Sequence, residues 1–245
     1  MVVTSLLFFY NDNGDKMKRI ILEEVDSTNE YLKRNIDTLK NQTIVMAKHQ
    51  TKGKGRNGHL WENPKDNNLM VSILYKDFNN IQDVWKMTII ASCSVVGLLD
   101  RYNIKAKIKW PNDIYVGDNK ICGILVESVI EESLQGVIVG IGLNVNDSNY
   151  TSMKDITGKT YNLSDLLVGI QTFMNIYYNL YLTNQFDKIL SYANDISYLK
   201  DKEIEYGNYG MVTFERLNNN GTVTIKTNNG RQDIIINEIT LHKEN

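Results

Sequence analysis

A basic segment interrupted by glycines is the part of this sequence best suited to hold an anion. Within KHQTKGKGRNGHLW the basic residues and glycines are Lys48, Lys52, Gly53, Lys54, Gly55, Arg56 and Gly58. Glycines let the backbone approach a ligand closely and leave amide N–H groups for oxyanions, and basic side chains add positive charge. The segment therefore favours phosphate binding, and the alternative is a solvated basic loop without a ligand.

The same glycines match the G-x-G-x-x-G pattern of dinucleotide-binding folds, which requires a helix to begin at the third glycine. His59, Leu60 and Trp61 follow Gly58, and Pro64 comes soon after, so a helix is not expected to begin there. This segment also lacks the pattern of a P-loop. Dinucleotide binding is therefore disfavoured.

Two further segments place polar side chains beside predicted strand ends. In KWPND, Asn112 and Asp113 follow a strand end, where Asp113 can bind Mg²⁺ through oxygen or receive a proton. The alternative is a tight Asn-Asp turn. In NKICGILVE, Lys120 begins an apolar strand. It is either a fixed cation beside a reacting phosphate or a snorkelling charge at the strand edge.

A small and apolar run, GVIVGIGLNV, has the composition of a central strand buried on both faces. Gly140 and Gly142 share one face of that strand and open room for a ligand or for another backbone. Asn144 continues the same face. The alternative is close packing of a helix on the sheet.

Hydrophobic periodicity predicts the elements that position these residues. Strands are expected at residues 19–24, 43–48 and 69–75, with three or four short strands between residues 107 and 146. Helices are expected at residues 30–39, 83–102, 162–182 and 185–194. Short β-type runs separated by Gly and Asn turns from residue 203 to residue 242 predict a small barrel of about five strands.

Composition narrows the class of protein. The 245 residues carry a net charge of −2, which disfavours a dedicated nucleic-acid binder, and no apolar run approaches the length that spans a bilayer. Cys93 and Cys122 are expected to be two buried thiols without a disulfide or a zinc site. We therefore expect a cytoplasmic protein that binds neither DNA nor membrane, with a loose segment before Met17.

In their order along the chain, these motifs resemble those of the biotin protein ligases. The resemblance covers residues 19–146 and rests on Ser27-Thr28-Asn29, Gln50 with GKGRNGHLW, KWPND, NKICGILVE and GIGLNVN. The glycine loop of the family usually has the pattern GRGRxGRxW. Here Lys54 replaces its first arginine and His59 its third, whereas Arg56 keeps the central one. Residues 1–18 are too few for a helix-turn-helix region, so the resemblance implies a short form without a DNA-binding domain.

The resemblance implies an α+β fold in which a mixed sheet with helices on one face forms a catalytic core like that of class II aminoacyl-tRNA synthetases. A small SH3-like β-barrel would follow at the C-terminus. The expected division is an extra N-terminal segment at residues 1–18, a catalytic domain at 19–199 and the SH3-like domain at 200–245.

The implied enzyme is an ATP-dependent biotin–protein ligase that forms biotinyl-5′-adenylate and transfers biotin to a lysine of a carrier protein. The residues that would bind biotin are Ser27, Thr28, Asn29, Gln50, Lys54, Gly55, Arg56, Lys120 and Gly123. Those that would bind ATP are Lys54, Arg56, Trp61, Asn112, Asp113, Lys120 and Asn144. The catalytic residues would be Arg56, Lys120 and Asp113, with Mg²⁺ arriving with ATP and its protein ligands unassigned.

The implied partners are biotin, ATP and a biotin carboxyl carrier protein domain, with a homodimer as a further expectation. Two alternatives stay open: a lipoate or octanoate ligase or transferase of related fold, and a non-catalytic vitamin or nucleotide sensor. Ser27, Thr28 and Gln50 favour biotin, because a ureido ring needs both donors and acceptors. The presence of both Arg56 and Lys120 disfavours a degenerate site.

Overall fold

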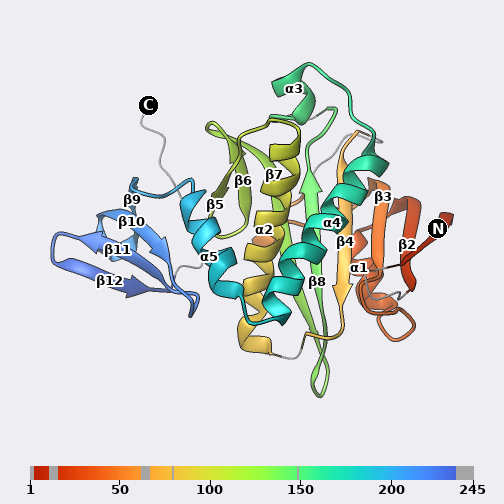
Figure 1. The fold of residues 1–245 in the computed structure, drawn as a ribbon, viewed down its shortest axis with the longest axis horizontal. Coiled ribbons are helices and arrows are strands. Elements are labelled where there is room, and N and C mark those ends of the chain that lie inside the picture. The colour runs from red at the N-terminus through yellow and green to blue at the C-terminus, as the bar shows by residue number, and fades with distance from the viewer. Residues whose placement is uncertain (1–2, 11–15, 62–66, 79, 148, 236–245) are drawn as a thin grey trace.

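An eight-stranded mixed sheet organises the chain in the computed structural model, which describes residues 3–10, 16–61, 67–78, 80–147 and 149–235 (Figure 1). In order across the sheet, the described strands are β1 (Val3–Tyr10), β2 (Lys16–Val25), β3 (Ile44–Gln50), β4 (Leu69–Tyr75), β8 (Leu134–Leu143), β7 (Asn119–Ile130), β6 (Asp113–Val116) and β5 (Lys107–Lys109). Strands β2 and β3 are parallel, and the other neighbours are antiparallel. The α+β class and the mixed sheet are thereby confirmed.

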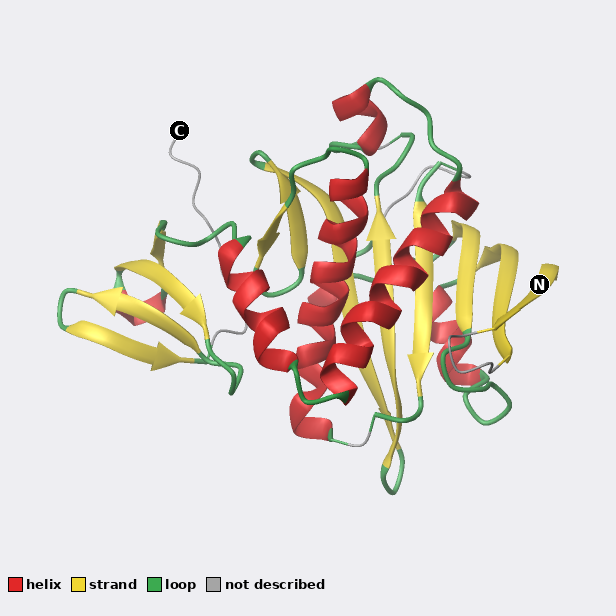
Figure 2. Ribbon diagram, viewed as in Figure 1, coloured by secondary structure: helices red, strands yellow, loops and turns green. Residues whose placement is uncertain are grey.

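Three helices, α2 (Val84–Arg101), α4 (Leu163–Leu182) and α5 (Phe186–Asp195), lie along one face of this sheet (Figure 2). Alternate residues of β8 face them, and Val137, Val139 and Ile141 are buried in the same core as the inner side of α2. The stretch Ile81–Arg101 has the length and hydropathy of a membrane-spanning helix, but most of it is buried within the fold, as expected of a core helix.

The opposite face of the sheet carries α1 (Thr28–Arg34), so the expectation of helices on one face was wrong. Tyr31 and Leu32 of α1 pack in a second, smaller core with Val45, Leu74 and Ile138 of the sheet. These strand residues alternate with those that face α2, as the two-residue repeat of a strand requires. The sheet is therefore covered on both faces.

Helix α1 begins earlier and ends earlier than the predicted span of residues 30–39. Asn35 follows its last residue, donates its side-chain amide to the Tyr31 carbonyl, and begins a run of turns through residue 38. Asparagine favours such local bonds at the end of a helix over continuation of it. At the other end, α1 begins at Thr28, so Thr28 and Asn29 lie within the helix rather than before it. Both side chains are buried.

The N-terminal segment was predicted to be loose, but Val3–Tyr10 forms the edge strand β1, paired antiparallel with β2. Aromatic and β-branched residues in this run favour a strand. Strand β2 begins at Lys16, so the predicted boundary at residue 18 falls inside a strand. The described residues among the first eighteen therefore belong to the sheet and do not form a separate segment.

The predicted short strands between residues 107 and 146 are β5, β6, β7 and β8, of which β7 and β8 are 12 and 10 residues long. Strand β8 lies between β4 and β7, which confirms a central strand. A short helix that the sequence did not predict, α3 (Met153–Thr157), follows and begins with a Ser152–Asp155 capping box.

A second, four-stranded antiparallel sheet forms the C-terminal part of the described chain. Its strands, in order, are β12 (Gly230–Ile234), β11 (Val223–Thr227), β10 (Met211–Leu217) and β9 (Glu203–Glu205). About five strands were predicted, and the residues of a fifth, 236–242, lie outside the described residues. Phe214, Val223 and Ile225 share the apolar core of α2 and α5. The second sheet therefore packs against the part of the chain that contains these helices.

Cys93 and Cys122 are both buried and unpaired, as predicted. Burial raises the pKa of each thiol well above its ordinary value, because the charged thiolate would lose its hydration. Neither side chain is therefore a reactive nucleophile at neutral pH.

Candidate active site

A cavity of about 350 Å³ lies on the α1 face of the sheet, and it gathers most of the predicted site residues. Its floor is formed by β4, β7 and β8, and its sides by the start of α1, the glycine loop and the KWPND turn. The predicted residues that line it are Ser27, Thr28, Asn29, Gln50, Lys54, Gly55, Arg56, Trp61, Asn112, Asp113, Lys120 and Gly123. Segments far apart in the sequence thus meet at one place.

The floor of the cavity is made of glycine. Gly123 of β7 lies opposite Gly142 of β8, and the Trp61 ring rests on both. A Cβ atom would lie 2.5 Å from the ring at Gly142 and 2.8 Å from it at Gly123, so a larger residue at either position would force the ring to move. Only glycine at these positions leaves the space that a ring-shaped group or Trp61 can fill.

One end of the cavity is neutral and polar. The Thr28 amide donates to Gln50 Oε1 at 2.7 Å, and the Thr28 hydroxyl lies 2.6 Å from Ser72 Oγ of β4. Ser27 and Thr28 are buried at the start of α1, and Gln50 ends β3. Hydroxyl and amide groups that can donate and accept therefore converge here, without a net charge.

The glycine loop folds back on itself at the rim of the cavity. Lys54 forms a β-bridge with Leu60, and the Trp61 amide donates to the Gly53 carbonyl at 2.9 Å. Between them, Asn57 and Gly58 adopt positive φ values of 53° and 77°, which a glycine and an asparagine tolerate best. The loop therefore has a defined shape, and its basic residues Lys54 and Arg56 line the cavity.

The other end of the cavity is cationic. Arg56 donates to Asn112 Oδ1 at 3.2 Å, which joins the glycine loop to the KWPND turn. Lys120 Nζ lies 2.7 Å from Asp113 Oδ1 and 5.4 Å from the centre of the Trp61 ring. Because Lys120 and Arg56 come from different elements and meet here, this end is suited to a phosphate or carboxylate.

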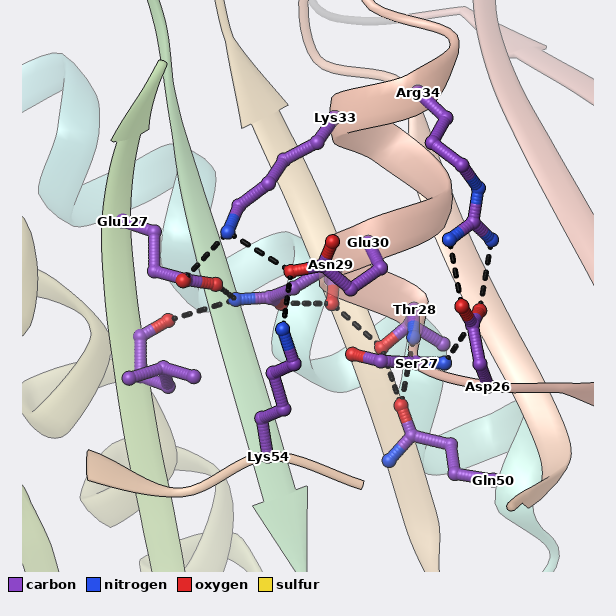
Figure 3. Close-up of polar contacts among 12 residues, drawn as sticks. Asp26, Ser27, Thr28, Asn29, Glu30, Lys33, Arg34, Gln50, Lys54 and Glu127 are labelled. Atoms are coloured by element: carbon purple, nitrogen blue, oxygen red, sulfur yellow. Dashed lines mark hydrogen bonds and ion pairs between the residues drawn. The ribbon is translucent and has the colours of Figure 1, made fainter. Parts of the chain in front are cut away.

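Lys54 also lines the cavity and is held at its edge by Glu30 of α1, at 2.8 Å (Figure 3). The hydrogen bond from Lys54 lowers the pKa of the Glu30 carboxyl; burial raises it, and the bond from Lys33 adds to the lowering. Glu30 is therefore ionised at neutral pH and keeps Lys54 paired. A lysine at this position offers a point charge without the planar fork of an arginine.

Asn144 is the predicted site residue that does not line this cavity. Its side chain donates to the Thr151 carbonyl at 3.1 Å, and its own carbonyl accepts from the Met153 amide. These bonds fix the chain between β8 and α3. A contact between Asn144 and the nucleotide stays a prediction.

Ser72 and Glu127 do not line the cavity but contact Thr28 and Asn29, which do, and neither was predicted. The lining residues Asn57, His59 and Lys109 were also not among the predicted site residues. Ser72 interrupts the fully buried strand LMVSILY, and a lone hydroxyl in such a strand signals a buried hydrogen-bond partner. Glu127 accepts hydrogen bonds from Asn29 and Lys33 of α1 (Figure 3). A carboxylate in the middle of a long strand of a central sheet was the available signal.

Among the described residues, no group of three or more His, Cys, Asp or Glu side chains gathers to hold a metal ion. Asp113 is a carboxylate on the cavity, and Lys120 Nζ lies 2.7 Å from its Oδ1. The geometry thus offers no preformed protein cage within the described part of the chain, and a divalent cation here would be held largely by a ligand's own phosphates.

Residues 21–144 match the Biotin/lipoate A/B protein ligase family, just over half of the chain. The bifunctional ligase/repressor BirA of Bacillus subtilis is 29% identical over 216 residues, which cover 81% of this chain and 66% of that protein. The human biotin–protein ligase is 35% identical over 147 residues, covering 55% of this chain and 20% of that protein. The chain spans about two thirds or less of the curated relatives that it matches.

Among solved structures, the biotin protein ligase of Aquifex aeolicus in complex with biotin and ATP is similar, with a TM-score of 0.79 and 28% identity. The likeness covers 92% of this chain and 99% of the Aquifex chain, so both sheets and the helices between them correspond. The matched segment 21–144 also contains every predicted residue that lines the cavity. The chain belongs to the Biotin/lipoate A/B protein ligase family.

Proposed function

We propose that this chain is a biotin–protein ligase. It joins biotin and ATP to give biotinyl-5′-adenylate and pyrophosphate, and then passes biotin to a lysine of a biotin carboxyl carrier domain, releasing AMP. The Aquifex ligase, which binds biotin and ATP and corresponds along nearly its whole length, supports this proposal.

The observation that carries the proposal is the polarity of one cavity. Its neutral end, at Thr28 and Gln50, suits a cyclic urea, and its cationic end, at Arg56 and Lys120, suits a carboxylate next to a phosphate. The glycine floor between the ends accommodates a flat bicycle. A ligand with a ureido head and an acidic tail fits this arrangement along its length.

In the first step, a biotin carboxylate oxygen attacks the α-phosphorus of ATP, and the bond to pyrophosphate breaks. Both reactants are anions, so they repel each other unless cations lie between them. Lys120 and Arg56 provide that charge in a site partly closed to water, where such contacts stabilise the transition state most. Mg²⁺ enters with ATP as part of that substrate.

In the second step, the acceptor amine attacks the biotinyl carbonyl and AMP leaves with the shared oxygen. The amine must lose a proton, and Asp113 is the carboxylate beside the reacting end. Its ion pair with Lys120 gives it a second role, which is to hold the ammonium in place. Asn112 is fixed by a bond from its amide to the Ile124 carbonyl at 3.1 Å and in turn positions Arg56.

The carrier domain reaches the site through an adjoining groove of about 920 Å³. This groove shares Arg56 and Asn112 with the cavity and extends to Trp85 and to the Gly221 turn of the second sheet. An acceptor lysine could enter along it without displacing α1. We also propose a homodimer. We propose a cytoplasmic location because Cys93 and Cys122 are free thiols, which are typical of reducing compartments.

The test is exchange of labelled pyrophosphate into ATP, measured with biotin, lipoate or octanoate and with no acceptor protein present. The proposal expects exchange that depends on biotin alone, since the adenylate forms before the acceptor binds. Exchange that depends on lipoate or octanoate would assign the chain to the other branch of its family. Binding of biotin without any exchange would identify a sensor.

A further inference from the structure

We propose that Glu127 is a positioning residue that sets which atoms at the neutral end of the cavity accept hydrogen bonds, although it does not line that cavity. The inference rests on the proposed biotin ligase function and deepens it. It concerns the chain of contacts from Glu127 through Asn29, Ser72 and Thr28 to Gln50. Figure 3 labels Glu127, Asn29, Thr28 and Gln50.

The carboxylate of Glu127 fixes the orientation of the Asn29 side chain. Glu127 Oε2 accepts from Asn29 Nδ2 at 2.7 Å, and Oε1 accepts from Lys33 Nζ at 2.6 Å. An ionised carboxylate can only accept, so Asn29 must turn its NH₂ group towards it. Asn29 Nδ2 also donates to the Leu125 carbonyl oxygen, at 3.4 Å. Asn29 Oδ1 therefore faces the other way, towards Ser72.

Packing prevents Asn29 from relaxing into another position. Its side chain is buried directly above Gly140, where a Cβ atom would lie 2.4 Å from Asn29 Oδ1. The amide can turn over about its own axis but cannot move aside. Its orientation is thus a choice between two states, and the charge of Glu127 decides it.

The donors in the contacts between Asn29, Ser72 and Thr28 can then be assigned, because each hydroxyl has only one proton. Ser72 Oγ contacts both Asn29 Oδ1 and Thr28 Oγ1 but has one proton. Asn29 Oδ1 can only accept, so the Ser72 proton goes there. The 2.6 Å contact between Ser72 and Thr28 then requires Thr28 to donate its single proton to Ser72.

This order leaves two acceptors side by side at the neutral end. Thr28 Oγ1 lies 3.0 Å from Gln50 Oε1, and Thr28 now has no proton to place between them. Gln50 Oε1 is fixed as an acceptor because it takes the Thr28 amide N–H. Both residues line the cavity, so a ligand that supplies an N–H relieves the repulsion between the two oxygens. A ureido N–H does this, whereas a dithiolane ring or an alkyl chain does not.

Glutamine at position 127 should reverse this order of donors. Glutamine has one acceptor oxygen in place of two, and we expect that oxygen to face the Lys33 ammonium, which also pairs with Glu30 at 3.0 Å. The amide NH₂ of the new side chain would then face Asn29. The Asn29 amide would turn over, so that its oxygen accepts from that NH₂ group and its own NH₂ group donates to Ser72. Ser72 would donate to Thr28, and Thr28 to Gln50, so the two acceptors would be satisfied without a ligand.

The experiment measures biotin affinity by calorimetry, without ATP, for wild type, E127Q, K33M and E127Q/K33M. We expect E127Q to bind biotin roughly 10- to 100-fold more weakly, the range for losing a hydrogen bond at a buried polar site. K33M keeps Glu127 and should stay within about threefold of wild type, since an acceptor still faces Asn29. The double variant should regain most of the affinity, because without the ammonium the substituted glutamine can turn its oxygen to Asn29.

Recovery in the double variant separates positioning from a merely structural role, which would make it no better than E127Q. E215Q is the matched control, because it makes the same change in the remote ion pair with Arg231. Unchanged affinity of E127Q, or no recovery in the double variant, would overturn the inference while biotin binding by wild type stands. Absence of biotin binding by wild type would instead overturn the proposed function and the inference with it.

Discussion

The two faces of strand β8 carry different kinds of residue. On one face Val137, Val139 and Ile141 are buried against the helices, and on the other Gly140 and Gly142 carry no side chain at all. The same ten residues thus contribute a packed layer to one side and an open floor to the other. The cavity lies over the part of this face, at Gly140 and Gly142, that has no side chains, whereas Ile138 on the same face packs against α1.

This difference separates stability from function within a single strand. Burying a branched side chain contributes about 1.5–3 kcal/mol to folding, so the helix face should determine stability. Gly140 and Gly142 on the other face bury little apolar surface, because they have no side chains. Gly142 instead leaves space for Trp61 or a ligand. Substitutions on the two faces should therefore have different consequences, and each of the following predictions tests that separation.

The largest effect is expected for Lys120→Ala, on the site face of β7. Removing the ammonium beside Asp113 should lower biotin-dependent pyrophosphate exchange by roughly 10²–10³, the usual value for one charge-stabilising contact. The melting temperature should stay close to that of wild type, because Lys120 is partly exposed. The control is Lys105→Ala, which removes an exposed ion pair with Asp100. Near-normal exchange in Lys120→Ala would make Lys120 a snorkelling edge charge.

On the helix face, Val139→Ala should destabilise the fold and leave ligand binding alone. Val139 is fully buried, and loss of two methyl groups plus the resulting cavity should cost about 2–3 kcal/mol. For a chain of this size, that lowers the melting temperature by roughly 5–10 °C. Biotin affinity of the folded protein should not change. Val168→Ala, at an exposed position of α4, is the matched control. A marked loss of affinity in Val139→Ala would show that the faces are coupled.

Much of this architecture could be predicted from sequence. The alternation of branched residues and glycines in GVIVGIGL predicted a central strand with room on one face, and β8 has both properties. The polar or basic segments that meet at the cavity were also predicted, because glycine, lysine and arginine in close sequence suit an anion wherever they lie. Local chemistry of this kind does not depend on which strands are neighbours.

The features that the sequence did not predict depend on tertiary neighbours. Ser72 and Glu127 acquire their roles only because β4 and β7 flank β8 beneath α1, which no local pattern reveals. Asn144 continues the glycine face in sequence, but β8 ends at Leu143, so the alternation no longer applies to it. Strand β1 was missed because a segment rich in Asn and Asp separates it in sequence from its pairing partner.

A smaller effect distinguishes two glycines of the same face. Gly140→Ala would place its Cβ against the buried Asn29 amide and should cost about 1–2 kcal/mol of stability, as overpacking usually does. Gly142→Ala would instead meet the Trp61 ring, which belongs to the glycine loop and can yield. We expect Gly142→Ala to melt close to wild type but to bind biotin more weakly. Equal melting of the two variants would mean that Asn29 is not fixed above Gly140.

The smallest effect is expected at the outer end of the α1 face, where Asp26 and Arg34 form a bidentate pair at 2.6 and 2.7 Å. The hydrogen bond from Arg34 is the largest cause that lowers the pKa of Asp26 to about 2; burial opposes it, and a bond from the Ser27 amide assists. Both side chains are more than a third exposed, so solvent screens the pair. Asp26→Asn should therefore cost less than about 1 kcal/mol at neutral pH.

The sign of the pH dependence follows from the lowered pKa of Asp26. The unfolded chain keeps the ordinary value of 3.8, so the pair stabilises the fold fully above that pH and progressively less as the pH falls towards about 2. Urea denaturation of wild type and Asp26→Asn should show a stability difference that is constant near neutrality and closes over that acidic window. Biotin affinity should not differ between them, because Asp26 does not line the cavity. If the two proteins still differ in stability below the folded pKa of Asp26, the Asp26 carboxylate is not the cause of the difference. If Asp26→Asn binds biotin more weakly, the outer end of α1 also contributes to ligand binding.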